Sequence, residues 1–198
     1  MESSRKVGRP RTFDPEEALE RALHVFWEHG YEGASVTLLQ EATGLTAPQL
    51  YRAFTSKEHL FQLAVQHYQQ RYGFAPDPDL PFAQSIAEFL DRAAREFTTE
   101  PGRGCLVSTG LLATGRHAEV AAAVVRAERE QALVGLLARI RTAQEAGEVP
   151  STTDAEGLAR TIGALVQGMS VQARDGAGYP ALSAVAATAR ALLPAPVA

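Results

Sequence analysis

Several polar side chains lie close together at the start of one short predicted helix, where they could bind a ligand through hydrogen bonds. The segment TAPQLYRAF, residues 46–54, holds Gln49, Tyr51 and Arg52 within about one helical turn. The amide of Gln49 both donates and accepts hydrogen bonds, whereas the guanidinium of Arg52 only donates and always carries a positive charge. Such a set suits noncovalent recognition of polar edges and anionic groups.

Helix start and stop signals place this segment after two other short elements. Asp14-Pro15-Glu16-Glu17 has the cap, the proline and the acidic first turn of a helix start, and Gly30 ends the apolar pattern that follows. A second helix is expected from about 35 to 43. Gly44 ends it, because glycine adopts the left-handed conformation at the least cost. Two short helices joined by a tight turn that contains glycine predict a helix-turn-helix.

The third helix starts at a residue that can cap it. Thr46 and Gln49 fit the S/T-x-x-E/Q capping box, and Leu50 and Phe54 lie one turn apart as apolar anchors. In a helix-turn-helix the second helix enters the major groove of DNA with its first residues near the bases. Gln49 could therefore contact adenine, or it could complete its own capping box, and it cannot do both fully.

The predicted DNA contacts extend beyond this turn. Tyr51 and Arg52 would lie near backbone phosphates, and Lys57 stands at the start of the next helix, where amide groups also favour phosphate. The full predicted set in this unit is Thr37, Thr46, Ala47, Pro48, Gln49, Tyr51, Arg52 and Lys57. The alternative is an ordinary three-helix bundle with solvated polar tips.

Residues 30–61 as a whole resemble the N-terminal domain of TetR-family bacterial repressors. The matching positions are Gly30-Tyr31, Ser35-Val36, Glu41-Ala42, Gly44, Leu50-Tyr51, Phe54 and Ser56-Lys57-Glu58. The family positions that typically touch DNA correspond to Thr46, Ala47, Tyr51, Arg52 and Lys57. Ala47 and Pro48 stand where many members have lysine and glycine. The resemblance implies an all-helical homodimer, a palindromic double-stranded DNA operator, and a larger C-terminal domain that binds a small-molecule inducer.

The charge of the chain is distributed unevenly. Residues 1–12 carry four positive charges against one negative, a net +3, so the remainder carries −7 of the total net charge of −4. The basic residues of this arm are Arg5, Lys6, Arg9 and Arg11. Arg9-Pro10-Arg11 resembles the start of many TetR-family members, where the arm reaches the minor groove. The alternative is a solvated, disordered tail.

The remainder of the chain also predicts helices, which gives an all-α fold. Thr55 and Glu58 fit a second capping box, and the proline-rich stretch 74–81 reads as a break. Longer helices are expected at 82–99, 104–114, 117–146, 154–175 and 180–193. The predicted division is a basic arm at 1–12, a helix-turn-helix domain at 13–60, and a ligand-binding and dimerisation domain at 61–198.

The last two helices carry apolar stripes that need a partner surface. We assign these stripes to a homodimer interface, because a two-fold reader of DNA requires a dimer and the resemblance implies a four-helix interface. The predicted interface residues are Leu158, Ile162, Leu165, Val166, Met169, Leu182, Val185, Ala189 and Leu192. The alternative is that both stripes pack within the protomer.

A ligand pocket is predicted in the C-terminal part from its aromatic residues and its one cysteine. The candidates are Phe61, Tyr68, Tyr72, Phe89, Phe97 and Cys105. Arg103 and a nearby helix start would make the thiol of Cys105 more reactive, so that it could sense electrophiles. The alternatives are a buried, inert thiol and aromatic side chains that are plain core. His117 could share a metal with Cys105, but no metal-box spacing supports this.

The remaining features exclude several classes of protein. We expect no cofactor, metal site or catalytic set, because no Ser/His/Asp arrangement, phosphate loop or carboxylate pair stands out. The apolar runs fall short of the roughly 20 residues that span a bilayer, and the polar N-terminus favours a cytoplasmic protein. The sequence thus predicts a ligand-responsive DNA-binding repressor rather than an enzyme. The alternative is a helical interaction or small-molecule-binding protein, or an enzyme, with a non-functional helix-turn-helix.

Overall fold

The computed structural model describes residues 13–100, 102–111 and 118–194, and the regular structure of this part is entirely α-helical. The first four helices are α1 (Pro15–Gly33), α2 (Val36–Thr43), α3 (Ala47–Phe54) and α4 (Lys57–Tyr72). The others are α5 (Phe82–Thr98), α6 (Leu106–Thr109), α7 (Glu119–Glu145), α8 (Ala155–Arg174) and α9 (Tyr179–Ala191). The predicted all-α fold is confirmed. Within the described residues, no helix has the length and hydropathy that a membrane span needs.

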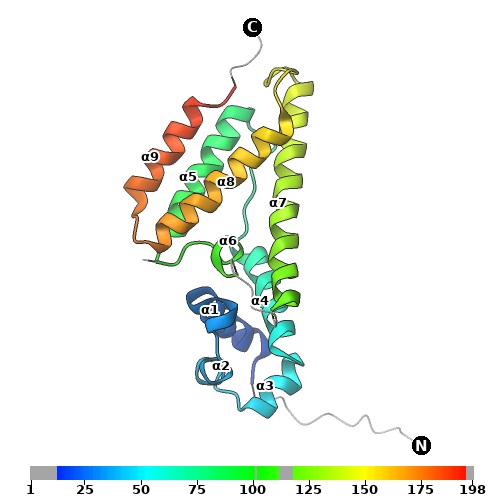
Figure 1. Cartoon of the computed structure of the whole chain (residues 1–198), viewed down its shortest axis with the longest axis vertical. Helices are drawn as coiled ribbons and strands as arrows, with labels where there is room; N and C mark the ends of the chain where they lie inside the picture. Colours follow the sequence, from blue (N-terminus) through cyan, green and yellow to red (C-terminus); the bar gives the residue numbers. More distant parts are fainter. Residues whose placement is uncertain (1–12, 101, 112–117, 195–198) are drawn as a thin grey trace, which may run out of the picture.

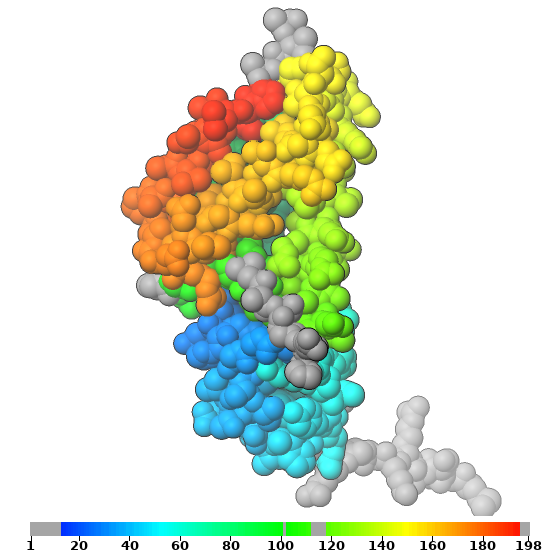
Figure 2. All heavy atoms as spheres, in the orientation of Figure 1, coloured from blue at the N-terminus to red at the C-terminus, as the bar shows by residue number. Residues whose placement is uncertain are grey.

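The molecule is elongated, with the helix-turn-helix at one end. Figure 1 shows α1, α2 and α3 at the lower end, α5, α8 and α9 side by side at the upper end, and α7 running along one side. The short helix α6 lies between the two ends and contacts α1, α4, α7 and α8. The space-filling view shows the first three helices against the base of the C-terminal helices (Figure 2).

Two hydrophobic cores correspond to these two ends. The first core joins α1–α4 to α6 and the start of α7, and the second joins α5, α7, α8 and α9. The boundary predicted between residues 60 and 61 falls inside α4. The helix continues through it because Phe61, Ala64 and Tyr68 are all buried in the first core.

The start of α4 differs from the prediction by one residue. Thr55 has a left-handed backbone (φ 67°), and the N-cap is Ser56, whose hydroxyl accepts a hydrogen bond from the His59 N–H at 3.1 Å. Glu58 accepts a hydrogen bond from the Tyr31 hydroxyl at 3.0 Å. Thr55 therefore belongs to the turn, and the predicted capping box is wrong at this helix.

The helix predicted at 104–114 is shorter in the structure. Gly104 is left-handed (φ 59°) and Cys105 is extended, so helical geometry begins only at Leu106. The helix α6 ends at Thr109, and Leu111 lies in the turn that follows. Residues 112–114 lie outside the described residues.

Candidate nucleic-acid interface and internal cavity

The turn between α2 and α3 is held by backbone geometry and short-range hydrogen bonds. Ser35 caps α2 by accepting from the Leu38 N–H at 3.1 Å, and Gly44 is left-handed (φ 71°), as predicted. The hydroxyl of Thr43 donates to the Leu39 carbonyl at 2.6 Å and accepts from the Leu45 N–H at 3.3 Å. These contacts fix the direction in which the chain enters α3.

The helix α3 is anchored on one face and exposed on the other. Leu50 and Phe54 are buried in the first core, where α3 contacts α2 and α4, and both are buried as the predicted anchors should be. The predicted contact residues Thr46, Pro48, Gln49, Tyr51 and Arg52 are exposed, while Ala47 is half-buried. Thr37 is exposed on the first turn of α2. The helix-turn-helix thus brings these seven residues onto one end of the molecule (Figure 1).

Gln49 makes the capping contact rather than pointing freely outward. Its side-chain oxygen accepts from the Thr46 N–H at 3.0 Å and from the Thr46 hydroxyl at 2.8 Å. Bidentate reading of adenine needs both the oxygen and the nitrogen of the amide. Reading a base through Gln49 would therefore require this cap to open.

Lys57 lies at the first position of α4, next to the helix-turn-helix. Its Nζ is 4.5 Å from the centroid of the Tyr31 ring. Partial burial lowers the pKa of the Lys57 ammonium, although the nearby carboxylates of Glu32 and Glu58 favour the charged form. The residues of the predicted basic arm, Arg5, Lys6, Arg9 and Arg11, lie outside the described residues.

A cavity of about 120 Å³ lies between α4, α5, α7 and α8. Tyr68, Tyr72, Phe89, Phe97 and Cys105, which sequence reasoning assigned to a ligand pocket, all line it. The structure therefore brings together side chains from α4, α5 and the loop before α6.

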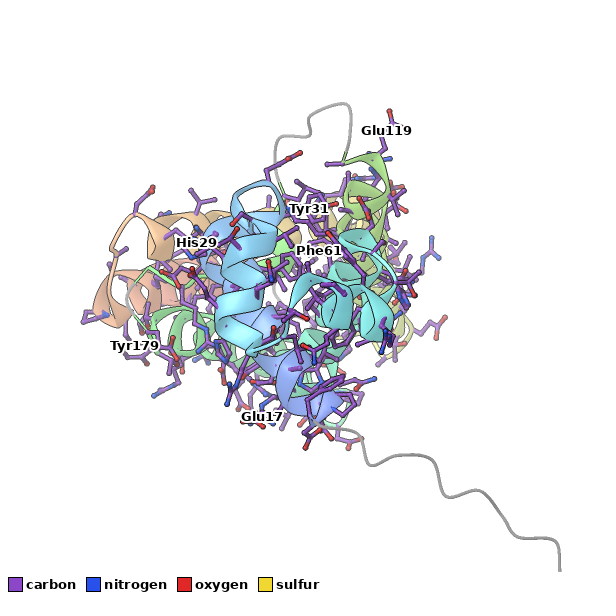
Figure 3. All side chains as sticks on the ribbon, turned by 90° about the horizontal axis from the view of Figure 1, so that it is seen from below. Glu17, His29, Tyr31, Phe61, Glu119 and Tyr179 are labelled. Carbon is purple, nitrogen blue, oxygen red and sulfur yellow. The ribbon has the colours of Figure 1, made fainter. Side chains whose placement is uncertain are left out.

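The sixth predicted pocket residue, Phe61, lies elsewhere. It is fully buried in the first core, with its ring 5.0 Å from that of Phe26 and 5.1 Å from that of Tyr31. Figure 3 shows Tyr31 and Phe61 close together in this region. Phe61 and Tyr68 lie on the same face of α4 but about 10 Å apart along its axis, so Phe61 lies beyond the cavity and packs against α1.

Polar groups that the sequence did not reveal also line the cavity. Gln69 donates from Nε2 to Glu128 Oε2 at 2.9 Å, and Arg129 donates to the Val107 carbonyl at 2.8 Å. Burial, together with the nearby Arg126, lowers the pKa of Arg129. These residues come from α4 and α7, and nothing in their local spacing indicated that they would meet.

The thiol of Cys105 lies in the cavity wall and accepts a hydrogen bond from the Tyr68 hydroxyl at 3.3 Å. Burial raises the pKa of Tyr68, which keeps this hydroxyl protonated as a donor. Arg103 was predicted to activate the thiol, but its guanidinium lies 3.6 Å from the Trp27 ring centroid and pairs with Glu100. Cys105 is half-buried, packs against both cores and borders the cavity.

The predicted dimer stripes are partly wrong. Ile162, Met169, Leu182 and Ala189 are buried in the second core of the protomer itself, because α8 and α9 must first cover α5 and α7. Leu158, Leu165, Val166 and Val185 are half-buried, Val166 lines the cavity, and Leu192 is 79% exposed. The exposed or half-buried residues of the outward face are mostly small: Thr161, Ala164, Gly168 and Val171 on α8, and Ala181, Ala184, Thr188 and Ala191 on α9. The same face of α8 also carries the larger polar residues Arg160, Gln167 and Gln172.

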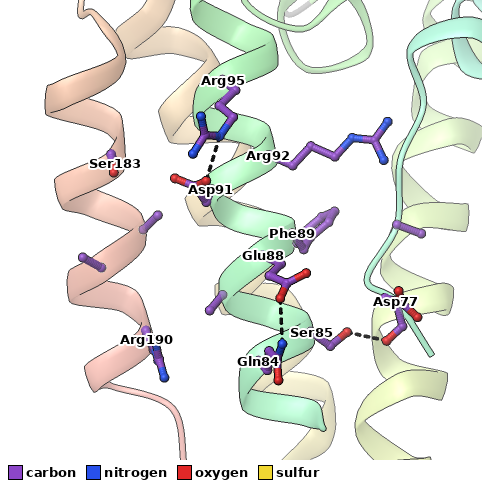
Figure 4. Close-up of a pocket in the computed structure, with 14 residues that line it drawn as sticks. Asp77, Gln84, Ser85, Glu88, Phe89, Asp91, Arg92, Arg95, Ser183 and Arg190 are labelled. Atoms are coloured by element: carbon purple, nitrogen blue, oxygen red, sulfur yellow. Dashed lines mark hydrogen bonds and ion pairs between the residues drawn. The ribbon is translucent and has the colours of Figure 1, made fainter. Parts of the chain in front are cut away.

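A wider open groove of about 1050 Å³ runs between α5 and α9 (Figure 4). Its polar groups largely pair with one another. Arg95 donates to Asp91 at 2.9 Å and Gln84 donates to Glu88 at 2.8 Å. This mutual pairing makes the groove a polar surface rather than a site that fits one ligand.

Comparison with known proteins gives matches along nearly the whole chain. The family described as "Bacterial regulatory proteins, tetR family" matches residues 18–64. The Escherichia coli K12 repressor ComR is 32% identical, over 94% of this chain and 92% of that protein. The repressor BdcR of the same organism is 31% identical over the same shares. A cysteine mutant of CifR, a TetR family transcriptional regulator solved with a 26-bp double-strand operator DNA, is 37% identical. It covers 94% of this chain and 100% of its own, with a TM-score of 0.89.

Proposed function

The chain belongs to the TetR family of bacterial regulatory proteins, and we propose that it represses transcription as a homodimer that a small molecule releases from a palindromic operator. It is a DNA-binding transcriptional regulator, like the repressors that it resembles along its length. The observation that carries the proposal is the exposed, polar start of α3, held on a buried anchor by a fixed turn.

The homodimer is proposed from the outward face of α8 and α9. Small residues let two copies of these helices approach closely, and covering Val171 and Leu192 would remove exposed apolar surface from water. A two-fold axis would then set the two α3 helices about 34–36 Å apart, so that they enter successive major grooves.

The inducer is proposed to bind the cavity that Tyr72, Phe89 and Phe97 line. A cavity of about 120 Å³ limits the inducer to a small molecule unless the walls move apart. Its aromatic lining favours an apolar or aromatic group. The inducer can weaken operator binding only by its difference in affinity between the two states of the protein.

Selection of binding sites from random double-stranded DNA, with the full chain, tests this function. We expect a palindromic sequence whose half-sites are about 10 base pairs apart, and a dimeric mass in light scattering. Arg52→Ala should weaken binding to the selected site, whereas Arg141→Ala, an exposed change on α7, should not. Failure to enrich any sequence would refute the proposal.

A further inference from the structure

The end of α1 is held by a side chain from α8. In a continuous helix the Tyr31 N–H would donate to the Trp27 carbonyl. Here it donates to the Gly110 carbonyl instead, at 3.1 Å. Arg174, the last residue of α8, donates from Nη1 to the freed Trp27 carbonyl at 3.0 Å and from Nη2 to the Glu28 carbonyl at 3.1 Å. A guanidinium suits this position because its rigid fork supplies several donors at once.

The side chain of the same tryptophan packs against the back of the cavity wall. Tyr68 and Tyr72, which line the cavity, meet the Trp27 ring edge-on at 4.7 and 5.0 Å between centroids. The Trp27 Nε1–H donates to the Gly104 carbonyl at 3.1 Å, and Arg103 lies over the ring. Trp27 is 5% exposed, so it is in contact with protein on almost every side.

The loop before α6 is packed tightly on α8. A Cβ atom at Gly104 would lie 2.8 Å from the Ser170 carbonyl oxygen and 2.9 Å from Arg174 Cγ, so only glycine allows this approach. The Cys105 N–H donates to the Ser170 hydroxyl at 2.7 Å. Cys105 lines the cavity, and so do residues of α8. The wall of the cavity, α8 and Arg174 therefore form one closely packed unit.

We propose that Trp27 and Arg174 transmit occupancy of the cavity to the helix-turn-helix, with Arg174 acting as a positioning residue. The proposal rests on the proposed function, because it assigns the coupling between the inducer cavity and α3. A ligand that displaces Tyr68, Tyr72 or Cys105 pushes against Trp27 and the Gly104 loop. Close packing cannot absorb such a shift locally, so the hold of Arg174 on α1 changes and α1 moves with α2 and α3.

A second contact between the cavity and α1 offers an alternative route for the coupling. The Tyr72 hydroxyl donates to Glu20 on α1 at 2.9 Å, so cavity occupancy could also reach α1 through this carboxylate. Arg174→Gln breaks the proposed route, and Glu20→Gln breaks the alternative. Arg141→Gln is the matched control, because Arg141 is exposed on α7, away from the proposed dimer face.

The experiment uses iodoacetamide, which alkylates Cys105 in the wall of the cavity and so places a small group inside it. Cys105 is the only cysteine, so its sulfur displaces iodide and forms a single thioether adduct, which intact mass confirms. Cys105→Ser gives the unmodified reference. Trp27 is the only tryptophan, so its fluorescence reports the arrival of the change at α1. Operator affinity is measured on the selected site before and after modification.

In the wild type the adduct should shift Trp27 emission and weaken operator binding about tenfold, within the usual range of coupling between sites. The same response is expected in Arg141→Gln and in Glu20→Gln. Arg174→Gln should bind the operator when unmodified, form the adduct, and change its affinity by less than about threefold. An equal loss of affinity in Arg174→Gln would overturn the proposal.

Hydrogen exchange on the wild type tests the proposal without a substitution. The adduct should speed exchange at the Tyr31 amide, because Gly30 breaks the helical geometry of α1 (φ 67°, ψ 174°) and this amide donates to the Gly110 carbonyl instead. Unchanged exchange there, or unchanged operator affinity of the modified wild type, would overturn the proposal. An unmodified wild type that binds no operator would refute the proposed function as well.

Discussion

The two ends of the molecule are packed differently. In the first core Phe26 and Phe61 are fully buried, and their rings and that of Tyr31 meet at 5.0 to 6.3 Å with little space between them. Where this core meets the second one, Tyr72, Phe89 and Phe97 border a cavity of about 120 Å³. A filled core holds the recognition helix in one orientation, whereas a cavity lets a ligand change the packing. We propose that the first core serves DNA recognition and that the cavity serves the response to a ligand.

The largest expected effect concerns the outward face of α8. Ala164→Glu would place two carboxylates near the proposed two-fold axis, each poorly solvated and repelling the other, at a cost of several kcal/mol per dimer. The variant should be monomeric in light scattering and should lose operator binding, although α3 is untouched.

Val134→Glu is the matched control, because Val134 is 66% exposed on α7. It should remain dimeric and bind the operator. A dimeric Ala164→Glu protein with normal operator affinity would show that the protomers meet through another face.

A second pair of variants compares the two kinds of packing directly. Phe61→Ala should lower the free energy of unfolding by about 3–5 kcal/mol, because the filled first core cannot collapse around the lost ring. Phe89→Ala should cost less than about 2 kcal/mol, since Phe89 is half-buried and already borders open space. Urea unfolding of both variants measures the difference, and equal costs would contradict the proposed contrast.

The next prediction, with a smaller expected effect, concerns how the helix-turn-helix recognises DNA. Gln49→Ala should relax the preference at one base pair in each half-site, by about 1–3 kcal/mol, if the cap opens on DNA. Lys57→Ala should instead weaken binding to all sequences alike, because a phosphate contact carries no base information. Site selection with each variant compares them, and an unchanged sequence preference for Gln49→Ala would make Gln49 a capping residue only.

The sequence predicted the helix-turn-helix better than it predicted the cavity and the helices around it, because the signals of the helix-turn-helix are local. The Gly44 turn and the anchors Leu50 and Phe54 each depend on residues a few positions apart, and all three are as predicted. The cap of α4 was missed because Thr55 and Ser56 are chemically equivalent candidates. Only the left-handed backbone at Thr55 decides between them.

The cavity and the helices around it depend on contacts between residues far apart in the sequence, which local spacing does not encode. The periodicity of α8 identified an apolar stripe, but it could not show that Ile162 and Met169 would be used to cover the protomer's own core. The contact of Arg174 with Trp27 joins residues 147 positions apart. Such contacts follow from the tertiary arrangement of α1, α6 and α8 and have no local signature.

The smallest expected effect concerns the hydrogen bonds that join α1 to α4. Glu20 on α1 accepts hydrogen bonds from His67 at 2.6 Å and from Tyr72 at 2.9 Å. Burial opposes its ionisation, but these hydrogen bonds and the charge of Arg71 outweigh burial and lower its pKa below the usual value of 4.5. A lowered carboxylate pKa stabilises the folded state above pH 4.5, and this stabilisation is lost as the pH falls through the folded pKa.

Glu20→Gln should therefore lower the free energy of unfolding at pH 7 by about 1 kcal/mol or less, because the side chain is partly solvated. It should also flatten the decline in stability below pH 4.5, where the wild type protonates Glu20. Glu17→Gln is the control on the same helix, since Glu17 forms an exposed pair with Arg21. Urea unfolding at several pH values measures both variants. Identical acid profiles for Glu20→Gln and the wild type would mean that packing alone, through Trp27 and its aromatic neighbours, holds α1 against α4.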